Sequence, residues 1–92
     1  MIYVIALQIE PKRDITLLIE EIKKSAGWSH HIDNTWMVAT EETAKKLYER
    51  LAVYLQPTDY ILIIELSSNA SYYGFLPNKV WKWITDTRNL GY

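Results

Sequence analysis

The chain has 92 residues, with ten Lys and Arg against eleven Asp and Glu, so its formal net charge is −1. This length and the absence of a low-complexity run predict one domain over residues 1–92. The charge balance excludes an overall basic surface for nucleic acid, and the absence of cysteine excludes disulfides and thiolate metal sites. No apolar run approaches ~18 residues and no secretory signal is visible, so we expect a soluble cytoplasmic protein with no membrane segment.

The first expected element is a strand over residues 2–9, which is apolar and rich in β-branched side chains. A helix should follow, with Asp14 as its cap and Gly27 as its end. Its apolar residues recur at helical spacing: Ile15, Leu18, Ile19 and Ile22. Residues 28–32 and 35–39 then predict a β-hairpin around Asp33 and Asn34, a pair that tolerates the positive φ of a tight turn.

A second helix is expected to begin at Thr40 as N-cap, with Glu41 and Glu42 in its first turn. These two glutamates should pair at i, i+4 with Lys45 and Lys46 on the exposed side. The apolar stripe consists of Ala44, Leu47, Tyr48, Leu51 and Leu55. The helix should therefore pack one face against a sheet.

After Pro57, residues 60–66 are a second strongly apolar strand. The order over residues 1–66 predicts an α+β, ferredoxin-like βαββαβ fold, with two helices on one face of a four-stranded antiparallel sheet. The first and last strands are apolar on both alternating sets of side chains, although two helices cover only one face. We therefore expect a second subunit or the C-terminal segment to cover the other face.

Residues 67–92 should form a C-terminal extension with a helix that begins after Pro77, capped by Asn78. Four aromatic residues of this extension are assigned to packing or to a dimer contact: Tyr73, Phe75, Trp81 and Trp83. Such rings can also stack on nucleic-acid bases. That role is less favoured because basic residues are not interleaved with them.

Four other side chains are candidates for sites. His30 and His31 are neighbours in an expected strand, so they should point to opposite faces and are poorly placed to share a metal ion. Lys12 and Arg13 follow the first strand and are the candidate contacts to nucleic-acid phosphates. The glycines are isolated and form no phosphate loop, so no nucleotide cofactor is expected.

Four stretches together carry a family resemblance: YVIALQI, AGWSHHIDNTWMVAT, DYILIIEL and GFLPNKVWKWI. In them the chain resembles the small CRISPR-associated Cas-two-like family, and more closely its SinR-like relatives, with VapD-like proteins in the wider family. The resemblance implies a ferredoxin-like fold and a homodimer joined through the sheets and C-terminal segments. It also implies one of several activities: Mg²⁺-dependent cleavage of RNA or DNA, toxin-like ribonuclease action, or a structural role in clamping DNA.

The family's metal-binding Asp near the end of the first strand is matched here by Gln8. A neutral amide adds no charge to a Mg²⁺ site, and Glu10 is the nearby carboxylate, expected on the same strand face. We therefore predict a non-catalytic homodimer that binds nucleic acid or a protein partner, without metal or cofactor. The alternatives are a Mg²⁺-dependent nuclease that uses Glu10 with His30 or His31, and an antitoxin-like protein-interaction module.

Overall fold

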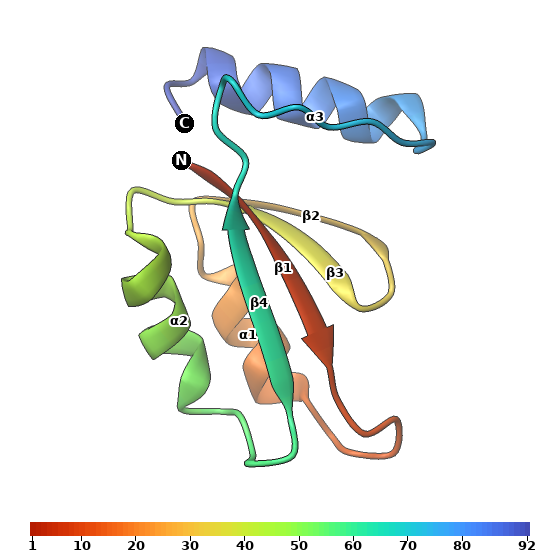
Figure 1. Ribbon diagram of the computed structural model, residues 1–92, viewed down its shortest axis with the longest axis vertical. Coiled ribbons are helices and arrows are strands. Elements are labelled where there is room, and N and C mark those ends of the chain that lie inside the picture. The colour runs from red at the N-terminus through yellow and green to blue at the C-terminus, as the bar shows by residue number, and fades with distance from the viewer.

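The computed structural model describes residues 1–92 as a four-stranded antiparallel sheet with three helices (Figure 1). The sheet order is β2-β3-β1-β4, made of β1 (Ile2–Gln8), β2 (Gly27–Ile32), β3 (Thr35–Ala39) and β4 (Tyr60–Glu65). The helices are α1 (Thr16–Lys23), α2 (Ala44–Ala52) and α3 (Asn78–Asn89). The predicted α+β class is confirmed, and the architecture is compatible with a ferredoxin-like arrangement.

One face of the sheet packs against α1 and α2, and the main core lies between these two layers. In each strand every second side chain reaches this face, and in each helix the residues three and four apart do so. The core cluster has nine buried residues: Tyr3, Ile5 and Leu7 of β1, Leu18 and Ile22 of α1, Trp36 and Val38 of β3, and Leu47 and Leu51 of α2. The strand and helix periodicities seen in the sequence therefore converge on one core.

The third helix lies across one end of the opposite face, near the start of β1 (Figure 1). There Ile84 packs against Ile2 and Leu66, and Trp81 and Trp83 pack around them. The C-terminal segment, which is one of the two expected covers, therefore packs on this face. It covers only the end where β1 begins and β4 finishes.

Helix α2 begins later than predicted. Its N-cap is Thr43, whose hydroxyl accepts a hydrogen bond from the backbone N–H of Lys46 at 3.2 Å. The Thr40 hydroxyl instead accepts from the N–H of Glu42 at 3.1 Å and donates to its Oε1 at 2.9 Å, which holds a separate turn. Glu41 and Glu42 thus precede the helix, and the predicted capping by Thr40 is wrong.

The turn between β2 and β3 also differs from the prediction. Gly91 is the one residue with positive φ, so Asp33 and Asn34 do not adopt the left-handed conformation. The register shifts between His30 and Ile32 instead, which is a β-bulge. Because of this shift Ile32 pairs with Thr35, on the face opposite α1 and α2.

The ends of the other helices differ less. Helix α1 begins beside Asp14, whose Oδ1 accepts from the backbone N–H of Thr16 at 3.0 Å. It ends at Lys23, and Gly27 starts β2 rather than ending the helix. Helix α3 begins at Asn78 without a capping side chain. No helix has both the length and the apolar character needed to cross a membrane.

Candidate functional site

The sheet face turned away from α1 and α2 is almost free of charge. We call it the open face. The strand pairing assigns to it Ile2, Val4, Ala6 and Gln8 of β1, Gly27, Ser29 and Ile32 of β2, Thr35, Met37 and Ala39 of β3, and Tyr60, Leu62 and Ile64 of β4. None of these is Asp, Glu, Lys or Arg. A face of this kind cannot contact phosphate through its own cations, but it can be covered by another apolar surface.

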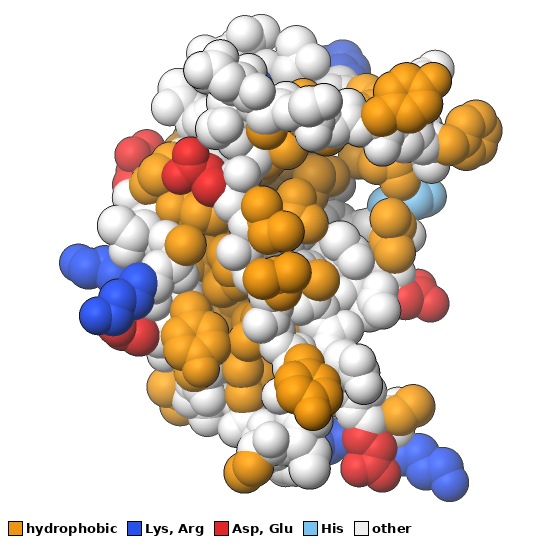
Figure 2. Space-filling model, in the orientation of Figure 1, with side chains coloured by type: hydrophobic (Ala, Val, Ile, Leu, Met, Phe, Trp, Pro, Cys, Tyr) orange, Lys and Arg blue, Asp and Glu red, His pale blue; other side chains and the backbone are white.

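The part of the open face over β4 and the end of β1 is left uncovered by α3. Tyr60, Leu62 and Ile64 are 68%, 57% and 54% exposed. They lie in one row, beside exposed Gln8 and Ala6 of β1. Figure 2 shows hydrophobic side chains gathered over this middle region below α3, with charged side chains mostly at the margins. We call these five residues the bare patch.

The four aromatic residues predicted to pack divide into two pairs. Trp81 and Trp83 pack within the chain, and the Trp81 Nε1 donates to the carbonyl oxygen of Leu76 at 3.1 Å. Tyr73 and Phe75 are fully exposed. These two rings therefore add apolar surface beside the open face.

Gln8 and Glu10 lie in different places. Gln8 is the last residue of β1 and belongs to the bare patch, opposite Tyr60. Glu10 lies in the turn beyond the strand, where its carbonyl oxygen accepts from the N–H of Arg13 at 3.1 Å. It does not share the strand face of Gln8 as predicted, because the chain leaves the sheet before Pro11.

The two histidines lie on different sides of the sheet. The His30 ring stacks on Trp36 with centroids 3.7 Å apart, and its Nε2 donates to the carbonyl oxygen of Asp33 at 2.9 Å. His31 lines a cavity on the open face. Glu10 and His30 do line one cavity of about 510 Å³, but no group of three or more His, Asp or Glu side chains is placed to hold a metal ion.

The two basic residues after β1 differ in exposure. Arg13 donates to Asp59 Oδ1, and its side chain is only 15% exposed. This hydrogen bond lowers the pKa of Asp59 and raises that of Arg13. Lys12 is exposed. Arg13 therefore ties the β1–α1 turn to the start of β4, and Lys12 is the cation of the pair that a ligand can reach.

Two of the three cations of the C-terminal helix are also used within the chain, whereas the third, Lys79, is exposed. Arg88 donates to the carbonyl oxygens of Leu66 at 2.6 Å and Ser67 at 3.1 Å, and Lys82 pairs with Asp86 at 2.6 Å. In Figure 1, α3 and the turn after β1 lie at opposite ends of the molecule. The basic residues are therefore not gathered on one surface.

An ion network between α1 and α2 was not predicted from the sequence. Arg50 donates to Glu21 Oε2 at 3.1 Å, to Glu42 Oε1 at 2.8 Å and to Ser25 at 3.0 Å. These hydrogen bonds lower the pKa of both glutamates, and they raise the pKa of Arg50. Partners separated by eight to 29 residues leave no periodic signal in the sequence.

Three surfaces are therefore candidate binding sites: the open face, the exposed aromatic pair Tyr73 and Phe75, and the cavity at His31. The ion pairs of Arg13 and Arg50 hold the scaffold together. Comparison of the chain with protein-family models, with curated proteins and with solved structures finds no match.

Proposed function

We propose that this protein is a non-catalytic binding module that acts as a homodimer through the bare patch. The observation that carries the proposal is a row of three large hydrophobic side chains, each more than half exposed, on a strand face without charge. Contiguous apolar surface of this kind marks interaction sites in proteins of this size. The patch also lies where both faces of β1 and β4 are apolar in the sequence.

A second copy of the chain is the occupant that fits best. In a two-fold interface the same surface of both copies is in contact. A face with charges of one sign would therefore repel its copy, whereas a neutral face does not. Two sheet faces can pack about 10 Å apart with interdigitating side chains. Only 17 of the 92 residues are buried, so burial of the bare patch would add substantially to a small core.

Nucleic acid is a less suitable occupant of this face. Proteins that bind single strands on a sheet combine aromatic platforms with cations along the backbone path. Here the central strands present Val4, Ala6 and Met37. No Lys or Arg lies between or directly beside the exposed Tyr73 and Phe75 in the sequence. Nucleic-acid binding would therefore use a different surface, such as the one that carries the exposed Lys12.

A nuclease is the second candidate, because Glu10 and His30 line one cavity. Mg²⁺ sites favour carboxylates and oxygen ligands, and the His30 ring is already stacked and hydrogen-bonded. Incubation of labelled RNA and DNA with Mg²⁺ should leave both intact. Cleavage that disappears in Glu10→Ala would replace the binding proposal by the nuclease one.

We also infer that the sheet with α1 and α2 is a ferredoxin-like unit and that the chain is a relative of the Cas-two-like and SinR-like proteins. The order βαββαβ and the strand order β2-β3-β1-β4 support the first inference. The resembling sequence stretches support the second. Gln8, in place of the family's Asp, supports a member without the metal site.

The dimer is tested by light scattering coupled to size exclusion at micromolar concentration. We expect a mass twice that of the 10.8 kDa chain. Leu62→Asp should weaken the dimer at least about tenfold, because each interface would bury two carboxylates. Leu17→Asp is the matched control, since Leu17 is 65% exposed on α1 and lies outside the patch. A monomeric wild type, or equal effects of both changes, would contradict the proposal.

A further inference from the structure

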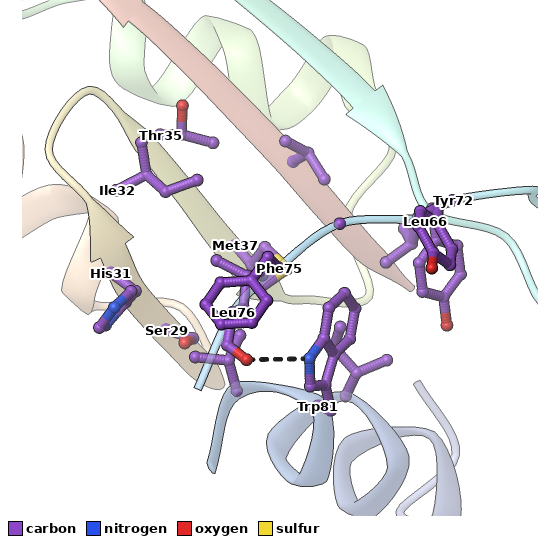
Figure 3. A pocket seen from close by; sticks show the side chains of 15 residues that line it. Ser29, His31, Ile32, Thr35, Met37, Leu66, Tyr72, Phe75, Leu76 and Trp81 are labelled. Atoms are coloured by element: carbon purple, nitrogen blue, oxygen red, sulfur yellow. Dashed lines mark hydrogen bonds between the residues drawn. The ribbon is translucent and has the colours of Figure 1, made fainter. Parts of the chain in front are cut away.

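A cavity of about 260 Å³ lies beside the bare patch, between the open face and the C-terminal extension (Figure 3). Its floor is the sheet, with Val4 of β1 and Met37 of β3. Its end wall is α3, with Val80 and Trp81. Residues 72–76, which we call the roof, line a third side of it. The cavity is therefore bounded by three separate parts of the chain.

Most of the lining is apolar, and apart from the hydroxyls of Tyr72 and Tyr73 its polar groups lie on the side of the β2–β3 hairpin. Eleven of the 15 lining residues are hydrophobic. The polar side chains Ser29, His31 and Thr35 come from the two hairpin strands, and Figure 3 shows them on the same side, away from Trp81. Ser29 and His31 make no side-chain hydrogen bond within the chain, so their polar atoms are free to bind a ligand. The cavity thus has an apolar end and a hydrogen-bonding end.

Few hydrogen bonds hold the roof in place. Residues 71–75 take part in no backbone hydrogen bond. Their attachment to the body is through α3, where Tyr72 stacks on Trp81 with ring centroids 6.4 Å apart and Trp81 Nε1 bonds the Leu76 carbonyl. A segment without backbone hydrogen bonds to the rest of the chain can move away from it at low free-energy cost. A ligand can therefore enter between the roof and the sheet.

We propose that this cavity binds a small amphiphile, with an apolar chain against Met37 and Trp81 and a hydrogen-bond-accepting head group at Ser29 and His31. The volume corresponds to about nine water-sized groups at ~30 Å³ each, which is the size of a chain of eight carbons with its head group at the rim. Largely apolar pockets with a few convergent polar groups are typical of small-ligand sites. No Asp, Glu, Lys or Arg side chain lines the cavity.

This site goes beyond the proposed dimer and uses different residues. The bare patch is built on β4 and the end of β1, whereas the cavity is built on β2, β3 and α3. None of the five residues of the bare patch lines the cavity. Loss of one function is therefore expected to leave the other intact.

Octanoate and 1-octanol are the probes, added to ¹⁵N-labelled full-length protein and followed by amide and indole chemical shifts. We expect saturable shifts at Ser29, Met37 and the Trp81 indole. If octanoate binds more tightly than 1-octanol, the preferred head group is a carboxylate. If the two probes bind equally, any head group with an oxygen acceptor is sufficient. Shifts confined to the bare patch would overturn the proposal.

Variants at Ser29 make the test specific. Ser29→Phe places a ring in the cavity on an edge strand and should weaken octanoate binding at least about tenfold. Ser29→Ala removes one donor without filling space and should weaken it about threefold to tenfold. Ser68→Phe, the same change on the exposed connection after β4, should bind as the wild type does. Unchanged binding in both Ser29 variants would overturn the proposal.

Discussion

Arg50 is the side chain that joins α1 to α2. Its guanidinium contacts Glu21, Glu42 and Ser25, and it also donates to the backbone carbonyl of Glu21 at 2.6 Å. The Tyr54 hydroxyl donates to the remaining oxygen of Glu21 at 3.1 Å. Most of the polar atoms at this helix contact are therefore satisfied, as the low exposure of Glu21 requires.

Removal of this guanidinium should destabilise the fold. Arg50→Met keeps the aliphatic stem but leaves two carboxylates without their shared donor, so we expect a loss of about 2–3 kcal/mol in the free energy of unfolding. Lys45→Met is the control, because its 3.9 Å pair with Glu49 is highly exposed and should contribute less than about 0.5 kcal/mol. Urea unfolding measures both, and equal losses would refute a special role for Arg50.

The same network predicts a dependence of stability on pH. The pKa values of Glu21 and Glu42 are lowered in the folded chain, chiefly by the hydrogen bonds from Arg50. Their contribution to stability is therefore present above the unfolded pKa of about 4.3 and is lost as the pH falls through the folded values. Thermal melts between pH 7 and pH 3 should show this loss, and Arg50→Met should show a smaller one. An equal decrease in Tm at low pH in the wild type and in Arg50→Met would contradict the role of Arg50 in lowering these pKa values.

Helix α2 depends on its N-cap, because its nine residues are too few to be stable alone. Thr43→Ala removes the acceptor for the Lys46 N–H and should lower the free energy of unfolding by about 1 kcal/mol. Thr58→Ala, an exposed change in the turn before β4, should have almost no effect. Denaturant unfolding compares the two, and a neutral Thr43→Ala would place the helix start elsewhere.

Helix α3 is part of the folded unit because Ile84 is buried against Ile2 and Leu66. Ile84→Ala should cost about 2–4 kcal/mol, since it removes buried methyl groups and leaves a cavity. Leu90→Ala is the control, because Leu90 is 78% exposed beyond the helix. Thermal unfolding should separate the two variants by several degrees, and a neutral Ile84→Ala would mean that the helix is detached in solution.

The proposed dimer makes the stability of the protein depend on its concentration. A dimer that dissociates on unfolding gains stability by mass action, so Tm should rise when the wild-type concentration is raised tenfold. Leu62→Asp should remove this rise, whereas Leu17→Asp should keep it. A Tm that is independent of concentration in the wild type would argue against the bare patch as an interface.

The class of fold and the order of its elements can be read from the sequence. Strand and helix periodicities are local properties, because side chains alternate in strands and repeat every three to four residues in helices. The core residues of β1, α1 and α2 were therefore predictable, and so was the need to cover a second sheet face. The apolar character of Leu62 and Ile64 is visible in the sequence for the same reason.

Which of these residues are in contact is visible in the folded chain and not in the sequence. The partners of Arg50 and Arg13 are distant in sequence, so no local pattern reveals them. The placement of α3 decided how much of the open face stays bare, and the bulge near His31 decided which hairpin residues line the cavity. Contacts of this kind depend on the relative position of whole elements, and that position is settled by packing of the complete chain.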